Sequence, residues 1–179
     1  MILVQQYILT SRSYLLIMQS KDIVNLTKAL GEQCIAQGII LTTIESCTGG
    51  ILAAQLTNIA GSSAWYHKGY VTYSNQSKIE CVSVNQKTID QYGAVSQQTA
   101  NEMVLGGINN NQNNLGLSIT GIAGPSGGTK IKPVGTVFFA VAKKGNIIFE
   151  HKALFKGNRE EIRQKALLFA LNQLLTLTL

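Results

Sequence analysis

The sequence predicts a single α/β domain of three layers (αβα), in which a mixed β-sheet lies between helices. Helical and strand-like segments alternate through roughly the first two thirds of the 179 residues, as they do in sheets with helical connections. The last part instead contains two strand-like segments joined by a tight turn, followed by one long helical segment. A hairpin of this kind adds antiparallel strands to the parallel part of the sheet, so we expect a mixed sheet.

The first elements are predicted from caps and from the spacing of apolar residues. Ser20 can cap a helix in which apolar residues recur at helical spacing until Gly38. The short apolar run 39–44 is rich in β-branched residues and is typical of a buried strand. A further helical stretch, 51–59, ends near Gly61, whose backbone freedom suits the end of a helix.

The middle of the chain predicts a second strand and two more helices. Residues 70–73 are β-branched and aromatic and indicate a short strand. Ser74 or Asn75 can cap a helix that carries Lys78 in its first turn. Ser96 begins a helix that extends through Met103 to Ile108.

The remaining elements are a polar turn, a third strand, the two arms of a hairpin and a last helix. Their positions, in this order, are 109–114, 115–120, 134–141, 146–154 and the segment after Asn158. Asn158 is followed three residues later by Glu161, which is a capping-box pattern. We expect residues 19–179 to form the domain and residues 1–18 to be an amino-terminal extension outside its core. Polar residues interrupt that extension too often for a secretory signal.

Composition excludes several classes of protein. The hydrophobic content of 45% is too high for a disordered chain. Three scattered cysteines do not make a disulfide framework and favour the cytoplasm, and no apolar stretch approaches the length that spans a bilayer. The net charge of +6 comes from Lys and Arg spread singly along the chain. This spread favours a solvated basic surface, or a local pocket for a small anion, over a nucleic-acid-binding face.

Three predicted strands are each followed by polar residues at their carboxyl ends. The residues concerned are Ser46, Tyr73 and Thr120. Ligands of open α/β sheets settle beyond the carboxyl ends of the strands. If the three strands are parallel neighbours, these side chains converge in one crevice.

Ser46 and Lys78 are the candidate nucleophile and its base. Ser46 precedes a helix start with two glycines, where free backbone N–H groups can hold an oxyanion or a phosphate. Lys78 lies near the positive end of a helix, and partial burial would lower its pKa further, toward the range of a general base. Tyr73 could share a proton network with Lys78. Two structural interpretations stay open: Ser46 as a helix cap and Lys78 as a solvated surface residue.

Other reactive residues are weaker candidates. Cys47 has no evident histidine partner and is interpreted as a small buried residue. We place His67 in a polar turn and His151 on an exposed strand, and neither belongs to a Ser-His-Asp arrangement. No cluster has the spacing of a metal site. We therefore expect no metal and no cofactor.

The glycine-rich segment 121–135 is either an anion-binding loop or a mobile lid. Lys130, Lys132 and Arg159 could add positive charge around a phosphate. From this chemistry alone, the chain is interpreted as a serine hydrolase that acts on a phosphorylated small molecule.

Six short blocks carry a resemblance to a known family. They are Glu45–Gly50, Gly61–Ser63, Tyr73–Asn75, Gly93–Ser96, Thr120–Pro125 and Lys132–Val137. In this order they closely resemble the competence/damage-inducible CinA carboxy-terminal family, from about Ser20 to the last helix. The resemblance implies hydrolysis of the carboxamide of nicotinamide mononucleotide to nicotinate mononucleotide and ammonia.

The resemblance also implies roles for residues of this chain. It places the catalytic serine at Ser46, the lysine at Lys78, the tyrosine at Tyr73 and the threonine at Thr120. The supporting or substrate-binding candidates are Glu45, Thr48, Gly49, Gly50, Asn75, Gly121 and Arg159. A homodimer is expected from the family alone. Two rival hypotheses remain: a non-catalytic competence or DNA-damage accessory protein, and an amidase of the same mechanism with another substrate.

Overall fold

The computed structural model describes residues 12–108 and 114–179, with side chains from residue 23 onward. Its five-stranded sheet has the order β2-β1-β3-β4-β5. The strands are β1 (Ile40–Glu45), β2 (Tyr66–Val71), β3 (Asn114–Gly121), β4 (Thr136–Lys143) and β5 (Asn146–Leu154). The strand β1 is parallel to both of its neighbours, β2 and β3, whereas β4 pairs antiparallel with β3 and with β5. The predicted mixed sheet is confirmed.

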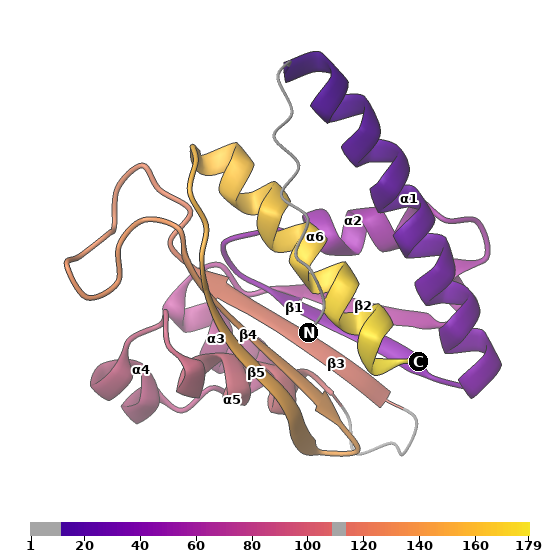
Figure 1. The fold of residues 1–179 in the computed structure, drawn as a ribbon. Coiled ribbons are helices and arrows are strands. Elements are labelled where there is room, and N and C mark those ends of the chain that lie inside the picture. The colour runs from indigo at the N-terminus through magenta and orange to yellow at the C-terminus, as the bar shows by residue number, and fades with distance from the viewer. Residues whose placement is uncertain (1–11, 109–113) are drawn as a thin grey trace, which may run out of the picture.

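Helices cover both faces of this sheet. They are α1 (Arg12–Gln37), α2 (Ile51–Thr57), the 3₁₀ turn η1 (Ser62–Ala64), α3 (Asn75–Val82), α4 (Gln86–Tyr92), α5 (Gln97–Gly107) and α6 (Arg159–Leu177). Figure 1 shows α1, α2 and α6 on one face and α3, α4 and α5 on the other. The three-layer prediction is therefore confirmed. In the described part of the chain, no helix has the length and apolar character required to cross a bilayer.

Each face of the sheet has its own hydrophobic core. Successive side chains of a strand point to opposite faces, and β4 feeds both cores in this way. Its residues Val137, Phe139 and Val141 belong to the core under α1, α2 and α6, and Phe138, Ala140 and Ala142 belong to the core against α5. The three central strands β1, β3 and β4 are therefore buried on both faces, whereas the edge strands β2 and β5 are largely exposed.

Two element boundaries differ from the prediction. The helix α1 begins at Arg12 and runs past Ser20 without a break, so the prediction of a helix start at Ser20 was wrong. The strand β2 begins at Tyr66, and His67 therefore lies in a strand and not in a polar turn. This strand is at the edge of the sheet, where polar side chains are tolerated on the exposed face. The boundary between residues 18 and 19 stays a prediction.

The short helix α4 was not predicted. Asn85 caps it by accepting a hydrogen bond from the backbone N–H of Lys87, and Thr88 donates to the carboxylate of Glu102 on α5. The seven residues of α4 are too few to show a clear helical periodicity, and the contacts of this helix with α5 cannot be inferred from the local sequence. The predicted polar turn at 109–114 lies, except for Asn114, outside the described residues.

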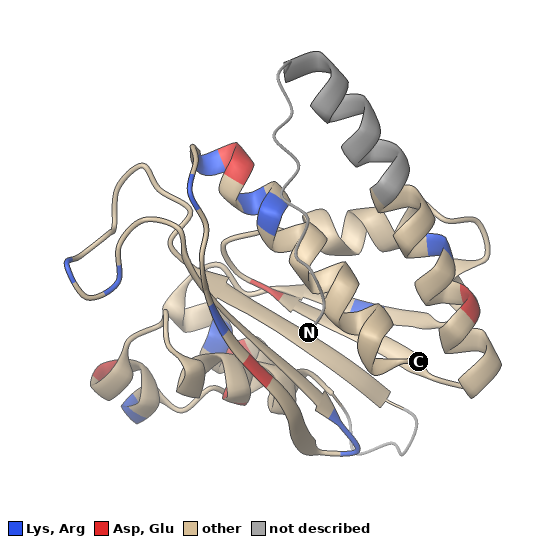
Figure 2. Cartoon of the chain, viewed as in Figure 1, with Lys and Arg blue, Asp and Glu red and all other residues tan. Residues whose placement is uncertain are grey.

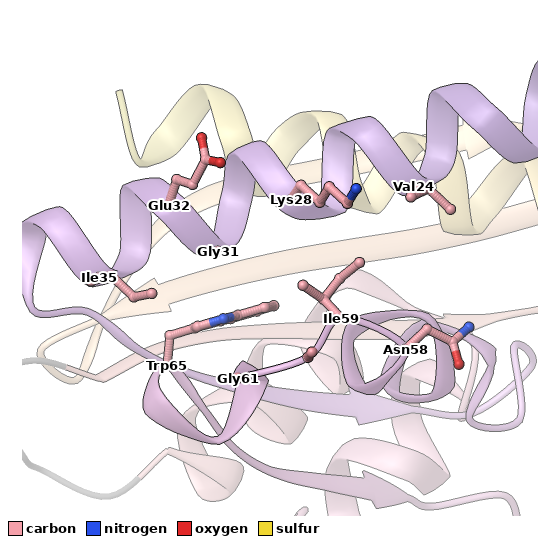
Figure 3. A pocket seen from close by; sticks show the side chains of 10 residues that line it. Val24, Lys28, Gly31, Glu32, Ile35, Asn58, Ile59, Gly61 and Trp65 are labelled. Carbon is pink, nitrogen blue, oxygen red and sulfur yellow. The ribbon is translucent and has the colours of Figure 1, made fainter.

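A groove of about 470 Å³ separates α1 from the turn after α2. Figure 3 shows the indole of Trp65 facing Gly31 across it. A Cβ atom at Gly31 would lie 2.9 Å from the indole ring, so glycine is what lets the ring pack under α1. The groove contains none of the residues predicted to form a functional site.

The helix that carries Lys78 is positioned by a close helix–helix contact. A Cβ atom at Gly106 of α5 would lie 1.8 Å from the backbone oxygen of Val82, the last residue of α3. At Gly107 it would lie 2.4 Å from the Ile44 side chain of β1. Only glycine allows α5 to approach α3 and the sheet so closely at these two positions.

We expect Gly106→Ala to destabilise the fold because its methyl group overlaps a backbone atom. The free energy of unfolding should fall by about 3 kcal/mol, the upper end of overpacking effects. Urea denaturation followed by circular dichroism measures this change. The control is Gln98→Ala, on an exposed position of the same helix. Equal midpoints for the two variants would contradict the close contact.

Candidate active site

The carboxyl ends of the three parallel strands meet at one edge of the sheet, as predicted. Strand pairing continues one residue past β1 on both sides. The backbone N–H of Ser46 donates to the oxygen of Ile119 on β3 (2.9 Å), and the N–H of Thr72 donates to the oxygen of Glu45 (2.8 Å). Ser46 is therefore held in register with both neighbouring strands.

Ser46 and Lys78 are in direct contact. The Nζ atom of Lys78 lies 3.0 Å from Oγ of Ser46 and donates to the backbone oxygen of Thr72 at 2.7 Å. Lys78 is 1% exposed and Ser46 is 7% exposed. The helix α3 starts with a capping box formed by Ser74 and Ser77, which fixes the helix start three residues from Thr72. The predicted pair of serine and lysine is thus assembled inside the protein.

Burial lowers the pKa of Lys78 from 10.5 to about 8. The cause is desolvation, because the protonated amine loses its hydration when the side chain enters the protein. The nearby Cys47 thiol acts weakly in the opposite direction. Both hydrogen-bond partners of the amine are neutral oxygens, so no carboxylate stabilises the charged form there. The predicted direction of the shift is confirmed, with burial as its main cause.

Glu45 points away from this pair, toward the start of α2. Its fully buried carboxylate accepts hydrogen bonds from the backbone N–H groups of Gly50 (3.0 Å), Leu52 (3.2 Å) and Ala53 (2.8 Å). Carboxylates are stabilised at this position by the free N–H groups and by the helix dipole. The start of α2 already holds an anion, which is Glu45 itself.

In the described part of the chain, the turn after Ser46 has two backbone N–H groups that do not bind another residue. Gly49 donates to the oxygen of Ser46, and Gly50 donates to Glu45. Among the described residues, the N–H groups of Cys47 and Thr48 have no acceptor in another residue, and the N–H of Cys47 interacts with its own sulfur. The buried hydroxyl of Thr48 has no partner there either. Gly49 and Gly50 have φ values of 63° and 91°, which explains why glycines stand here.

Two arginines on the first turns of α6 reach three of the surrounding loops. Arg159 donates to the oxygen of Gly124 and to the hydroxyl of Tyr73, both at 2.8 Å. Arg163 donates through Nε and Nη2 to the oxygen of Thr48, at 3.2 Å and 2.6 Å. Sequence reasoning missed Arg163. Its spacing of four residues from Arg159, which places both on one helix face, was the available signal.

Several predicted residues make their hydrogen bonds or close contacts to groups other than the serine–lysine pair. Tyr73 is 60% exposed and bonds to Arg159, so it does not lie between Ser46 and Lys78. Thr120 is buried, and its hydroxyl donates to the oxygen of Ala94 at 2.7 Å. Asn75 is the exposed first residue of α3. A Cβ atom at Gly121 would lie 2.8 Å from the oxygen of Thr136.

The remaining candidates are distributed around the site or outside it. Lys130 is exposed on the glycine-rich loop, and Lys132 donates to the backbone oxygen of Tyr92 at 2.8 Å. Burial raises the pKa of Cys47 to about 12, which confirms the interpretation of a small buried cysteine. His151 is exposed on β5, as predicted. Among the described residues, no three His, Cys, Asp or Glu side chains gather as a metal-binding group.

The lowered pKa of Lys78 predicts a specific dependence of stability on pH. Between pH about 8 and about 10.5, the unfolded chain binds a proton at Lys78 that the folded protein does not. The free energy of unfolding therefore rises with pH in this window, by up to about 1.4 kcal/mol per pH unit. Cys34 and Cys47, whose pKa values burial raises, act oppositely above pH 9.

Comparison of the wild type with Lys78→Met isolates this contribution, because the cysteines are common to both proteins. Their difference in the free energy of unfolding should shift in favour of the wild type by about 2 kcal/mol between about pH 7.5 and about pH 9.5. Lys87→Met, which removes an exposed lysine, is the control. A difference that does not change with pH would show that Lys78 is not desolvated.

Comparison with known proteins agrees with this geometry. The family model for the CinA C-terminal domain matches residues 23–178. Nicotinamide-nucleotide amidohydrolase PncC of Enterobacter agglomerans is 45% identical over 154 residues, which cover 86% of this chain and 94% of that protein. The protein of the same name from Escherichia coli K12 is 41% identical over 157 residues, which cover 88% and 95%.

Solved structures show the same fold. The crystal structure of the competence/damage inducible protein CihA from Agrobacterium tumefaciens matches with a TM-score of 0.84 and 39% identity, over 88% of this chain and 96% of that chain. The family model and the relatives each cover most of the chain. The chain belongs to the CinA C-terminal domain family.

Proposed function

We propose that this protein hydrolyses the carboxamide of nicotinamide mononucleotide to nicotinate mononucleotide and ammonia. The observation that carries the proposal is the buried contact of 3.0 Å between Ser46 and a lysine of lowered pKa. A serine next to a neutral amine is an activated nucleophile for an amide carbon. The substrate itself is taken from the relatives named nicotinamide-nucleotide amidohydrolase.

In the proposed first step, Lys78 works in its neutral form. In this form the amine can donate an N–H to the oxygen of Thr72 and accept the hydroxyl proton of Ser46, whose Oγ lies 3.0 Å away, with its lone pair. The amine takes the proton of the Ser46 hydroxyl while Oγ attacks the amide carbon. Because the two side chains touch, no relay through Tyr73 is needed.

The tetrahedral oxyanion needs hydrogen-bond donors that the fold has not already used. The hydroxyl of Thr120 and the N–H groups of Gly49 and Gly50 donate to atoms of the protein. Among the described residues, the N–H groups of Cys47 and Thr48 bind no other residue. We assign the oxyanion to these two groups.

Lys78 also serves the leaving group. The protonated amine returns its proton to the departing nitrogen, the C–N bond breaks, and ammonia leaves. Lys78 then takes a proton from the water that attacks the acyl-enzyme, and it returns this proton to Oγ of Ser46 as the ester bond breaks. Ser46 and neutral Lys78 are thereby regenerated, and the product leaves as a carboxylate after losing its proton to solvent. Proton balance therefore needs one titrating group and no further acid.

The supporting roles are proposals of the same kind. Thr48, Gly49 and Asn75 lie on the loop or helix start that follows a strand, and Gly121 is the last residue of β3. Arg159 and Tyr73 provide an exposed, positively charged rim for the phosphate. Glu45 contributes by holding the start of α2. We propose a cytoplasmic location, because the substrate is an intracellular metabolite, and a homodimer remains a family-based prediction.

A nucleic-acid role receives no support from the distribution of charge. Figure 2 shows Lys and Arg on several separate elements and on both faces of the sheet. Two of the arginines, Arg159 and Arg163, bind atoms of the protein around Ser46. The charge of the chain thus serves the site in part and has no single extended basic face in this view.

Purified protein should release ammonia from nicotinamide mononucleotide, and Ser46→Ala should abolish the release without unfolding the chain. The loss follows because the attacking oxygen is removed. The control is Ser63→Ala, at an exposed serine of η1. Normal turnover by Ser46→Ala would show that another group attacks. Turnover of other amides but not of the mononucleotide would favour the rival amidase.

The rate should follow the deprotonation of Lys78. With a pKa of about 8, kcat/KM should rise about tenfold between about pH 7 and about pH 9 and then level off, since only the neutral amine acts as base. Lys78→Arg should be inactive throughout, because a guanidinium stays protonated. A profile that is flat, or that falls over this range, would exclude neutral Lys78 as the base.

A further inference from the structure

We propose that Arg163 is a positioning residue that holds the turn after Ser46 in its reactive geometry. The inference rests on the proposed function, because it assumes that Ser46 is the nucleophile. Arg163 acts on the turn from α6, more than one hundred residues away in the chain. It contacts neither Ser46 nor Lys78 in the structure, and its effect is transmitted through the backbone of Thr48.

The contact has the geometry of a clamp. Two donors of one guanidinium, Nε and Nη2, converge on the single oxygen of Thr48. Two donors fixed in one plane restrict the direction of the carbonyl more than a single donor does. Arg163 is itself held by the helix, because Ile162 and Ala166 beside it are buried in the core.

The turn needs such a clamp because its own backbone is permissive. A single internal hydrogen bond, from Gly49 to the oxygen of Ser46, closes it. Both Gly49 and Gly50 adopt positive φ values, and glycine reaches other backbone conformations at little cost. The Thr48 carbonyl shares a peptide plane with the N–H of Gly49, whose bond to the oxygen of Ser46 closes the turn. Rotation of this carbonyl would break that bond and release the segment 46–48, which carries the proposed oxyanion donors.

The two arginines of α6 have different proposed roles, one in substrate binding and one in positioning the turn. Arg159 is exposed and bonds to the exposed Tyr73, so it is accessible to a substrate. Arg163 is half-buried, and its contacts in the structure are with the main chain of the nucleophile turn. Loss of Arg163 is therefore expected to lower the rate of the chemical step and to leave substrate binding largely unchanged.

The test compares Arg163→Met and Arg163→Lys with Lys165→Met. Lys165 stands two residues further along α6, where it donates to the oxygen of Lys156, so its variant controls for the loss of one positive charge on this helix. We expect Arg163→Met to lower kcat about 100-fold, as small displacements of reacting groups do. KM should stay within about twofold. Arg163→Lys should be intermediate, and Lys165→Met should match the wild type.

A second measurement does not depend on the substrate. A small fluorophosphonate that reacts with activated serines reports the reactivity of Ser46, and the modified residue is identified by mass spectrometry. Inactivation of Arg163→Met should slow with kcat, while thermal unfolding shows that the variant is folded. If Arg163→Met does not fold, Arg163→Lys carries the comparison. A wild type that reacts with the reagent but does not hydrolyse the mononucleotide would contradict the proposed function only.

Two results would overturn the positioning role. A raised KM with unchanged kcat and unchanged Ser46 reactivity would make Arg163 a substrate-binding residue. Unchanged kcat, KM and Ser46 reactivity in both Arg163 variants would show that the turn keeps its geometry without the guanidinium.

Discussion

The structure around the site depends on the burial of one lysine. A protonated amine in the interior loses its hydration, so the surroundings of Lys78 favour the neutral form. They do this by offering the amine only a hydroxyl and a carbonyl oxygen, with Lys78 1% exposed. A carboxylate at the same place would have raised the pKa and left a permanently charged, unreactive base. The burial that keeps Lys78 in its reactive neutral form therefore also lowers the stability of the fold.

The other charged groups near Ser46 are also bound to the backbone and not to one another. Glu45 accepts three N–H groups of α2, and Arg163 donates to the oxygen of Thr48. The carboxylate of Glu45 is thereby satisfied by backbone donors at the start of α2, and the main cause of the lowered pKa of Lys78 is burial. This separation explains how a carboxylate and a neutral amine can both lie buried close to the same serine.

Local signals in the sequence were sufficient for the fold class. They marked Ser46 and Lys78 as a candidate pair but left open a helix-cap role for Ser46 and a surface position for Lys78. Strand periodicity, the capping patterns at Ser74 and Asn158 and the position of Lys78 after a helix start are all readable over a few residues. The clamp of Arg163 on Thr48 joins positions 115 residues apart, and the helix α4 depends on contacts with α5. Long-range contacts of this kind leave no periodic trace. The hydrogen bonds of Glu45 could not be predicted for the same reason, because its N–H partners come within reach only when α2 folds back on β1.

The topology explains why the last helix reaches a site built by the first strands. The strand β4 is antiparallel to β3, and β5 is antiparallel to β4, so β5 runs in the same direction as β1, β2 and β3. Its carboxyl end therefore lies at the same edge of the sheet as theirs. The helix α6 begins at Arg159, shortly after β5 ends, and its first turns are delivered to this edge. The strands β4 and β5 therefore also determine where α6 begins. The chain reverses direction once between β3 and β4 and again between β4 and β5, and as a result Arg159 and Arg163 lie next to the loops that follow the three parallel strands.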